Sequence, residues 1–429
     1  MISEQKKKKM SSLIPALALG STLLLGGCDL LDSILAVEAP SRVVATDLAD
    51  PAAASLLVAS VTNEFRCALT HYNVGGALVG MEFDDAAANS VLEIWDTRNH
   101  DTSGYGSQYA STNCGSGNPA LYLPLSQTRW LADDVLIRLG DWTDAEVAGR
   151  AQFQAEVATW AGYSYVLLGE SMCEVVFDGG PAQPPDAAFT LAVARFDQAI
   201  QLGSSDFQNL ARVGKARALL DMGQLSAASA VAALVPSGFS FTVPYSNAEA
   251  VTRNKAWELN IRDADVTIGT TYRNLSFGGV LDSRVLVDDT GLTGRSGAEV
   301  WEARKYPEAS TAIEVGGWEE AQLIMAEFAV ADGRLADAVA IIDVLHTNAG
   351  LPLFSDVVPG ATATQVMDQV IYERSAEMFL EGHHLWDIRA YNIPLEPPVG
   401  AISNSGAFYS DELCFQIPAR EFQNNPNIG

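Results

Sequence analysis

Apolar positions in this chain recur mostly every three or four residues, the spacing of helices with one buried face. In the first half this pattern predicts helices over residues 51–68, 83–95, 128–139, 143–168, 187–202, 206–222 and 226–235. Thr143 with Glu146 three residues later is typical of a capping box, and we expect it to begin the fourth of these helices. Further helices are predicted near residue 320 and near the C-terminus. The fold class is therefore expected to be all-α.

An internal likeness indicates how these helices are paired. Residues 216–236 (ARALLDMGQLSAASAVAALVP) resemble residues 326–346 (AEFAVADGRLADAVAIIDVLH). In both segments a helix of small residues ends at a glycine, Gly223 or Gly333, and a second helix follows. Small side chains let two helices approach closely and glycine permits the turn. This is typical of a tetratricopeptide-like helix-pair superhelix, whose pairs bury their faces by stacking.

The predicted repeats cover about residues 128–235 and 316–392, and residues 158–175 with 197–203 are a candidate for another pair. Two segments interrupt them. Residues 236–315 contain turn clusters and short β-branched runs, so we expect a loop-rich insertion with a small hairpin that covers the helices.

The other irregular segment, residues 96–124, is rich in Gly, Ser, Asn and Thr. A long polar segment with embedded aromatics is more typical of a functional loop than of disorder. Aromatic faces can stack on sugar rings while nearby polar groups bind the hydroxyls. The alternative is that the aromatics only hold the loop to the helices. The candidate ligand-binding residues are Trp95, Arg98, Asn99, Tyr105, Tyr109 and Tyr122.

Residues 371–395 (IYERSAEMFLEGHHLWDIRAYNIPL) are an unusually charged stretch of helix. Gly382 is predicted to end a first helix, capped at Thr362 or Thr364, and a short second helix follows. We expect Arg389 of the second helix to pair with a carboxylate of the first. Interlocking charges at helical spacing indicate a structural motif rather than acid/base catalysis. Its charged residues are Glu373, Arg374, Glu377, Glu381, Asp387 and Arg389.

The N-terminus has the pattern of a lipoprotein signal. Four lysines at residues 6–9 precede an apolar run and the sequence LGGC, which ends at Cys28. The apolar run is shorter than the roughly 20 residues that a membrane-spanning helix needs. We expect residues 1–27 to be removed, Cys28 to be lipidated, residues 28–50 to form a tether, and residues 51–429 to form one domain. The sequence does not indicate in which leaflet or on which face of the membrane the lipid anchor lies.

The net charge of −27 makes nucleic acid and anionic lipid poor partners. Four cysteines follow Cys28, and an even number in an exported protein permits two disulfides. We favour pairing Cys67 with Cys114, because both lie in the N-terminal region, which leaves Cys173 and Cys414. Free buried thiols are the alternative.

Recognised catalytic signatures are missing from the sequence. It contains no G-x-S-x-G, H-E-x-x-H or G-x-x-x-x-G-K-[ST] motif, so we expect no enzyme activity and no cofactor. His383, His384 and Asp387 are the best metal candidates, but adjacent helical side chains point about 100° apart. The cysteine spacings fit no zinc pattern, and we predict no metal site.

Two C-terminal motifs resemble the signature of a known family. Residues 373–389 follow the order E-R-x-x-E-x-x-x-E-G-H-x-x-x-D-x-R, and residues 414–427 contain CFQIP followed by E and N-N-P-N. Both are similar to motifs of the SusD/RagB family of outer-membrane lipoproteins, as is the helix EAQLIMAE at residues 320–327. The specific matches cover about the last quarter of the chain, and upstream the resemblance is one of architecture.

The resemblance implies a SusD-like helical fold and a role in nutrient uptake. The expected function is capture of oligosaccharides or other nutrients and their delivery to a TonB-dependent outer-membrane transporter. The protein would then be lipid-anchored in the outer membrane and exposed at the cell surface. Two alternatives are a tetratricopeptide-type assembly scaffold and a lipoprotein glycoside hydrolase. The identity of the ligand is not encoded in any recognised motif.

Overall fold

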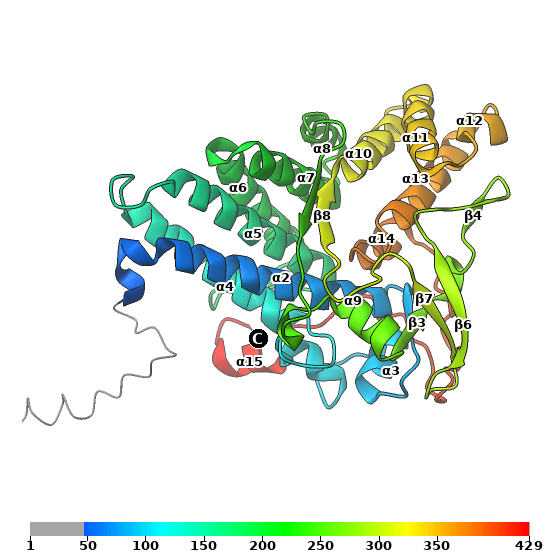
Figure 1. Ribbon diagram of the computed structural model, residues 1–429, viewed down its shortest axis with the longest axis horizontal. Coiled ribbons are helices and arrows are strands. Elements are labelled where there is room, and N and C mark those ends of the chain that lie inside the picture. The colour runs from blue at the N-terminus through cyan, green and yellow to red at the C-terminus, as the bar shows by residue number, and fades with distance from the viewer. Residues whose placement is uncertain (1–46, 429) are drawn as a thin grey trace, which may run out of the picture. The chain divides into compact units, whose positions relative to one another are not determined.

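The computed structural model of the chain describes residues 47–428 (Figure 1). The predicted signal peptide, Cys28 and most of the predicted tether lie outside the described residues. Residues 49–429 group into one compact unit, and the following concerns that unit.

Long helices dominate the fold, as predicted for an all-α protein. The first eight of four or more residues are α2 (Ala54–Val79), α3 (Ser90–Asp96), α4 (Tyr122–Asp141), α5 (Arg150–Ser171), α6 (Asp186–Leu202), α7 (Ser205–Asp221), α8 (Leu225–Ala232) and α10 (Trp318–Ala331). They are followed by α11 (Leu335–Ala349), α12 (Phe354–Val357), α13 (Ala363–Glu377), α14 (His384–Tyr391) and α15 (Ala419–Asn424). From α4 to α8 each helix packs against the next, and α8 then packs on α10 and α10 on α11 (Figure 1).

The α7–α8 and α10–α11 pairs confirm the internal repeat read from the sequence. Gly223 and Gly333 lie in the two turns with φ of 71° and 75°, which side chains disfavour. Ala216, Ala228 and Ala321 are buried in the interface that α8 shares with α7 and α10. The small residues therefore permit the close approach that their spacing predicted.

The third pair consists of α5 and α6 and is longer than the predicted residues 158–175 and 197–203. Glycines let the backbone of α5 approach two phenylalanines of α6. A Cβ on Gly162 would lie 2.6 Å from the Phe196 ring, and one on Gly169 would lie 2.5 Å from the Phe189 ring. Any larger residue at either position would force the helices apart.

Two predicted helices are corrected by the structure. In place of a helix over residues 83–95, the chain forms strand β1 (Phe83–Asp85), a turn, and then α3. The Asp85 carboxylate accepts hydrogen bonds from the backbone N–H groups of Ala87 and Ala88, and this turn replaces the first helical turns.

The second correction concerns helix α5, which begins at Arg150 after Gly149, whose φ is 74°, and not at Thr143. Glu146 does accept hydrogen bonds from Thr143, but they close a turn.

The insertion over residues 236–315 contains more strand than the single hairpin predicted. It is built of short antiparallel pairs and short helical turns. The pairs are β1 with β3 (Val266–Ile268), β2 (Ser240–Val243) with β8 (Ile313–Gly317), β4 (Ser276–Phe277) with β5 (Val280–Leu281), and β6 (Val287–Thr293) with β7 (Glu299–Ala303). The helical turns are η4 (Ala250–Thr252), α9 (Lys255–Trp257), η5 (Glu258–Arg262) and η6 (Thr270–Tyr272). Three further turns, η1 (Asp47–Ala49), η2 (Pro51–Ala53) and η3 (Gly106–Ala110), lie nearer the N-terminus.

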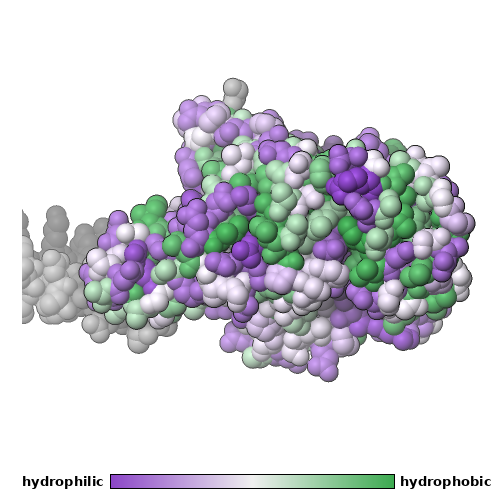
Figure 2. Space-filling view, turned by 90° about the horizontal axis from the view of Figure 1, so that it is seen from above, coloured by the Kyte–Doolittle hydropathy of each residue, from purple (hydrophilic) through white to green (hydrophobic). Residues whose placement is uncertain are grey.

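Hydrophilic and hydrophobic residues are interspersed on the face seen in Figure 2. None of the helices in residues 47–428 has both the length and the apolar character needed to cross a bilayer.

Candidate functional site

The C-terminal charged motif joins α13 to α14 through a buried ion pair. Thr362 caps α13 in a capping box, as predicted. The Arg374 guanidinium donates two hydrogen bonds, of 2.9 and 2.7 Å, to the carboxylate of Asp387. Gly382 turns the chain between the helices with φ of +80°, and a Cβ there would lie 2.7 Å from the Tyr72 ring. Arg374 therefore makes the link between the helices.

The predicted pairing of Arg389 with the first helix is wrong. Arg389 donates to the backbone carbonyl of Glu170 in α5 and stacks on Trp386. Because α14 lies between α13 and α5, this side chain reaches α5 instead.

The acidic residues of the motif bind partners outside it. Glu373 and Glu377 both accept hydrogen bonds from Arg284, at 2.6 and 2.8 Å. Glu373 also contacts His346 at 2.7 Å, and Glu381 pairs with Lys305 at 2.7 Å. The motif therefore ties the insertion and the last helix pair to α13, which is a structural role.

Three of the six candidate ligand-binding residues are fully buried and hold the C-terminal segment. The Arg98 guanidinium donates to the carbonyls of Ser410 and Pro397, and the Tyr109 hydroxyl donates to that of Gln416. Trp95 packs edge-on against Phe415. These three side chains have no exposed surface, and their contacts hold the C-terminal segment in place.

The other three candidates differ among themselves. Tyr122 is buried and its hydroxyl donates to Glu421. Asn99 is exposed, and its side-chain amide donates to the Phe408 carbonyl. Tyr105 is 59% exposed and is the one aromatic candidate on the surface. The six residues therefore do not form one binding surface.

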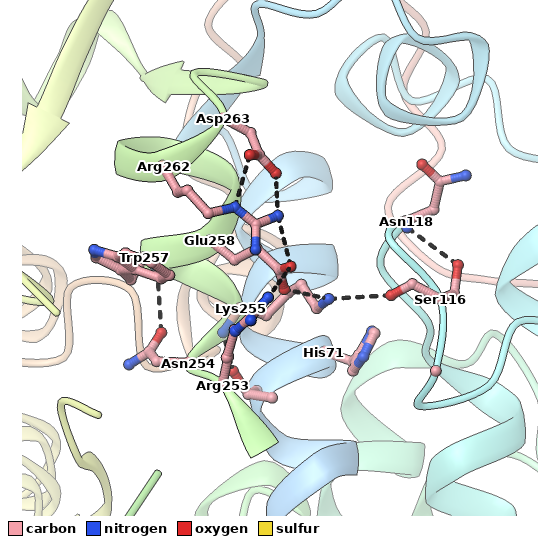
Figure 3. Close-up of polar contacts among 12 residues, drawn as sticks. His71, Ser116, Asn118, Arg253, Asn254, Lys255, Trp257, Glu258, Arg262 and Asp263 are labelled. Atoms are coloured by element: carbon pink, nitrogen blue, oxygen red, sulfur yellow. Dashed lines mark hydrogen bonds and ion pairs between the residues drawn. The ribbon is translucent and has the colours of Figure 1, made fainter. Parts of the chain in front are cut away.

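Three contacts fix the loop over residues 96–124 to the helices. Cys67 of α2 forms a disulfide with Cys114. The backbone N–H of Ala120 donates to His71 Nδ1, and the Lys255 ammonium donates to the Ser116 carbonyl at 3.0 Å (Figure 3). Burial, helped by the charge of Lys255, lowers the pKa of His71 to about 3, so its ring is neutral.

Lys255 is itself buried and pairs with Glu258 at 2.6 Å (Figure 3). The other cysteines, Cys173 and Cys414, form a second disulfide, which fastens the C-terminal segment near the end of α5. Loop and C-terminal segment are thus both held rigidly against the helical body.

These fixed segments enclose a cleft of about 320 Å³, which we call the acidic cleft. Its walls come from the β1–α3 region, from η6, from the turn between β6 and β7, and from the C-terminal segment near residues 397–409. The charged and aromatic residues that line it are Asp84, Asp85, Glu93, Asp96, Arg273, Glu299 and Tyr409. Polar side chains therefore dominate the cleft, with five carboxylates facing one guanidinium.

Asp84 is a carboxylate of the cleft that accepts no hydrogen bond from another residue of the described chain. It is 21% exposed, and its nearest cation is Arg273 at 3.9 Å. Asp96, in contrast, already accepts hydrogen bonds from the backbone N–H of Asp85 and from the Tyr409 hydroxyl. Asp85 is committed to the turn described above. An incoming hydroxyl group would therefore meet a free acceptor at Asp84.

Burial raises the pKa of Asp84 and of Asp85 to about 6. Arg273 opposes the rise at Asp84, and backbone N–H groups oppose it at Asp85. The pKa of Asp96 is raised further by burial and by the charge of Asp84. The cleft therefore holds carboxyl groups in a partly desolvated setting, where hydrogen bonds to them are strong.

A small hairpin in the C-terminal segment carries two exposed apolar residues at the cleft. Ile402 lines the cleft and pairs across the hairpin with Phe408 in an antiparallel bridge. Directly opposed residues project on the same face of a strand pair. Phe408, which is 63% exposed, therefore offers an aromatic surface beside the acidic cleft.

Sequence reasoning missed this cleft. Asp84, Arg273 and the hairpin of residues 402–408 are not among the residues that the sequence predicts for a binding site. The signal available was the presence of Ile402 and Phe408 in a Gly- and Ser-rich segment that follows the last helix motif. Among residues 47–428, no group of three or more His, Cys, Asp or Glu side chains is arranged to hold a metal ion.

Comparison with known structures identifies the class of fold. A SusD superfamily protein from Bacteroides vulgatus shares 13% identity at a TM-score of 0.67, covering 89% of this chain and 98% of its own. A SusD superfamily protein from Bacteroides fragilis shares 12% identity at a TM-score of 0.67, covering 89% of this chain and 99% of its own. A structure titled "Laminarin binding SusD-like protein" shares 14% identity at a TM-score of 0.65, covering 89% and 98%. The fold is thus that of SusD-like helical-repeat proteins.

The family model described as SusD family matches residues 320–428, the region that holds both C-terminal motifs. The matched region is about a quarter of the chain, and this chain is similar to the SusD family there. No curated protein sequence matches it.

Proposed function

We propose that this protein is a non-enzymatic capture protein that binds neutral oligosaccharides in the acidic cleft. The observation that carries the proposal is the combination of the Asp84 carboxylate, which lines the cleft and accepts no hydrogen bond within the described chain, with the exposed aromatic face of Phe408, which pairs with the cleft residue Ile402. Carboxylates accept hydrogen bonds from sugar hydroxyls, and the aromatic ring supports the C–H face of a sugar. Two structures of the same fold support the ligand class by their titles, "Laminarin binding SusD-like protein" and a "SusD-like carbohydrate binding protein" from Bacteroides vulgatus.

Delivery to a transporter is the second part of the proposal. Lipidation of Cys28 would hold the protein at the outer membrane, and the similarity to the SusD family supports a TonB-dependent transporter as the partner. The rigid helix pairs would then carry the cleft above that transporter. The test is co-purification of the full-length protein with a TonB-dependent outer-membrane transporter of the same cells. A protein that is released from membranes without detergent, or that never co-purifies with such a transporter, would contradict this part.

Glycan binding is tested by calorimetric titration of soluble β-glucans and other neutral oligosaccharides into the purified protein. We expect Phe408→Ala to weaken binding about tenfold through loss of stacking. Asp84→Asn should weaken it by at least about tenfold, because hydrogen bonds to charged groups contribute about 1.5–3 kcal/mol. Neither residue has a structural hydrogen bond from its side chain.

Phe422→Ala is the matched control, because Phe422 is 53% exposed in α15 and does not line the cleft. It should bind glycans as the wild type does. If both phenylalanine variants bind equally well, the acidic cleft is not the glycan site. If a glycan is cleaved during the titration, the protein is an enzyme, and the glycoside hydrolase alternative holds.

A further inference from the structure

A second acidic cavity lies on another part of the molecule, and we call it the glutamate pocket. It has a volume of about 260 Å³ and lies where the β2–β8 pair meets the start of α10 and the end of α13. Five carboxylates line it, those of Glu314, Glu319, Glu320, Glu377 and Glu381, with Met378 as its apolar element. It shares no lining residue with the acidic cleft.

Cations of the protein compensate only part of this charge. Arg284 pairs with Glu377 at 2.8 Å, and Lys305 pairs with Glu381 at 2.7 Å. Within residues 47–428, neither Glu314, Glu319 nor Glu320 forms an ion pair. Three carboxylates therefore face the pocket without an ion pair of their own, although Lys305 acts on Glu314 from nearby and Arg217 and Arg374 act on Glu320.

Glu320 is the decisive residue. Its side chain is buried, with the residue 4% exposed, and it lines the pocket, yet it makes no hydrogen bond or ion pair within the described chain. The nearest cations, Arg217 and Arg374, are committed to Glu170 and Asp387. Its carboxyl oxygens reach the pocket space, so a donor that enters the pocket meets an acceptor to which the described chain donates no hydrogen bond.

Glycine keeps the pocket open. A Cβ on Gly317, at the end of β8, would collide with the carboxylate of Glu314 and approach Glu319 Oε2. The φ of Gly317 is −141°, a value that any residue adopts, so the backbone does not require glycine here. The lack of a side chain instead leaves room beside the carboxylates.

We propose that the glutamate pocket binds a primary ammonium group of a small organic ligand, with Glu314, Glu319 and Glu320 as acceptors. An ammonium group has three N–H donors and so matches three carboxylates. The alkyl carbons next to it would pack on Met378. A divalent metal is the weaker candidate, because in residues 47–428 no such cluster has the geometry of a metal site.

Burial raises the pKa values of all three unpaired carboxyl groups of the glutamate pocket. Burial raises the pKa of Glu314 to about 7 and that of Glu320 to about 8, although Arg217 and Arg374 oppose the rise at Glu320. Burial also raises the pKa of Glu319. Burial thus favours the protonated form of Glu314 and Glu320 near neutral pH, and a bound ammonium ion would displace these protons. Affinity should therefore rise as the pH increases from 6 to 8.5.

The test is calorimetric titration of n-butylammonium into the full chain, at several pH values and in two buffers of different ionisation enthalpy. We expect saturable binding, release of protons at pH 7, and no binding of the uncharged analogue 1-butanol. Glu320→Gln keeps the shape of the side chain and should weaken n-butylammonium at least tenfold. Gly317→Ala, which narrows the pocket beside Glu314, should weaken it as well.

Glu174→Gln is the matched control, since Glu174 is exposed, unpaired by any ion pair in the described chain, and outside the pocket. It should leave n-butylammonium binding unchanged. This result would distinguish binding in the glutamate pocket from a non-specific attraction of cations to an acidic protein.

Glucosamine and Nα-acetyl-lysine amide, titrated in the same way, distinguish an amino sugar from a lysine side chain as the source of the ammonium group. Equal affinity of the wild type and Glu320→Gln, or no binding of n-butylammonium at millimolar concentration, would overturn the proposal. Loss of glycan binding in Asp84→Asn with n-butylammonium binding retained would separate this site from the acidic cleft.

Discussion

Arg374 illustrates how a single buried charge can determine the position of a helix. Its bidentate bond with Asp387 is nearly free of solvent, with side-chain exposures of 4% and 2%. Asp387 accepts both hydrogen bonds through its two oxygens, so removal of Arg374 would leave a buried carboxylate without its cation. Removing one partner of this ion pair therefore costs much more stability than replacing both partners by well-packed apolar residues would.

We expect Arg374→Ala to lower the free energy of unfolding by about 3–5 kcal/mol, because the substitution strands the buried Asp387 carboxylate. Urea unfolding measures the change. Arg334→Ala is the control, since Arg334 is 44% exposed and pairs with the exposed Asp332, and exposed ion pairs contribute little to stability. Glycan affinity of folded Arg374→Ala should equal that of the wild type. A fully stable Arg374→Ala protein that has lost glycan binding would contradict the structural role.

Arginines also show why residue-level roles were hard to assign from sequence. Arg98 was placed among ligand contacts because it precedes a polar loop, and Arg389 was paired with the preceding helix. Both instead donate to backbone carbonyls of segments distant in sequence. A guanidinium has five N–H donors and can satisfy carbonyls as well as carboxylates, so charge pattern alone does not reveal its partner.

At the scale of elements, the loop over residues 96–124 depends on a neutral histidine. His71 accepts a hydrogen bond from the Ala120 N–H and has its pKa lowered to about 3 by burial. The unfolded chain takes up a proton at this site below pH of about 6.5, whereas the folded chain does not. Because the folded pKa is the lower one, the stability that His71 contributes is present above pH 6.5 and is lost as the pH falls toward 3.

We expect His71→Asn, which keeps an acceptor for Ala120, to weaken this acid dependence. Between pH 7.5 and 5 the free energy of unfolding should fall by about 2 kcal/mol less than in the wild type, by proton linkage at one site. Urea unfolding at a series of pH values measures it, and the slope is informative even if the variant is less stable overall.

His346→Asn is the contrasting variant. Burial opposes the charge of His346, but its hydrogen bond with Glu373 prevails and raises its pKa. Its stabilisation is therefore present at low pH and is lost as the pH rises through the folded pKa, so its removal should make the acid loss steeper. Identical slopes for the two histidine variants would contradict these assignments.

Elements defined by local sequence were predicted well, and elements defined by distant contacts were not. The α7–α8 and α10–α11 pairs follow from Gly223, Gly333 and the alanines beside them, all within 21-residue segments. Strand β1 was missed because its partner β3 lies about 180 residues later in the chain. The acidic cleft was missed for the same reason, since its walls come from four segments that lie far apart in the sequence.

Exposure was the other quantity that the sequence could not supply. Tyr105 and Tyr109 stand four residues apart in the same polar loop, yet Tyr105 is exposed and Tyr109 is buried against Phe415. The contact depends on the C-terminal segment, which Cys414 fastens to Cys173. Only the tertiary path of that segment decides which aromatic faces solvent.

At the scale of the whole molecule, strong acidity and the site act together. The chain carries a net charge of −27, and the acidic cleft adds five carboxylates around one arginine. The negative electrostatic potential of the net charge adds to that of the cleft carboxylates, and the shape of a cleft concentrates the electric field. The protein should therefore discriminate among glycans by charge as well as by shape.

We expect neutral oligosaccharides to bind at least about tenfold more tightly than uronate oligosaccharides of equal length at 10 mM salt, because each carboxylate of the ligand would meet like charges. The Debye screening length shortens from about 30 Å at 10 mM to about 3 Å at 1 M salt. The difference in affinity between neutral and uronate oligosaccharides should therefore become smaller as salt is added. Methyl-esterified uronates, which have the same shape without the charge, are the control and should bind like neutral sugars. Asp84→Asn should reduce the discrimination by charge as well as the affinity. Tighter binding of the free uronates than of their methyl esters at 10 mM salt would show that Arg273, and not the carboxylates, dominates recognition in the cleft.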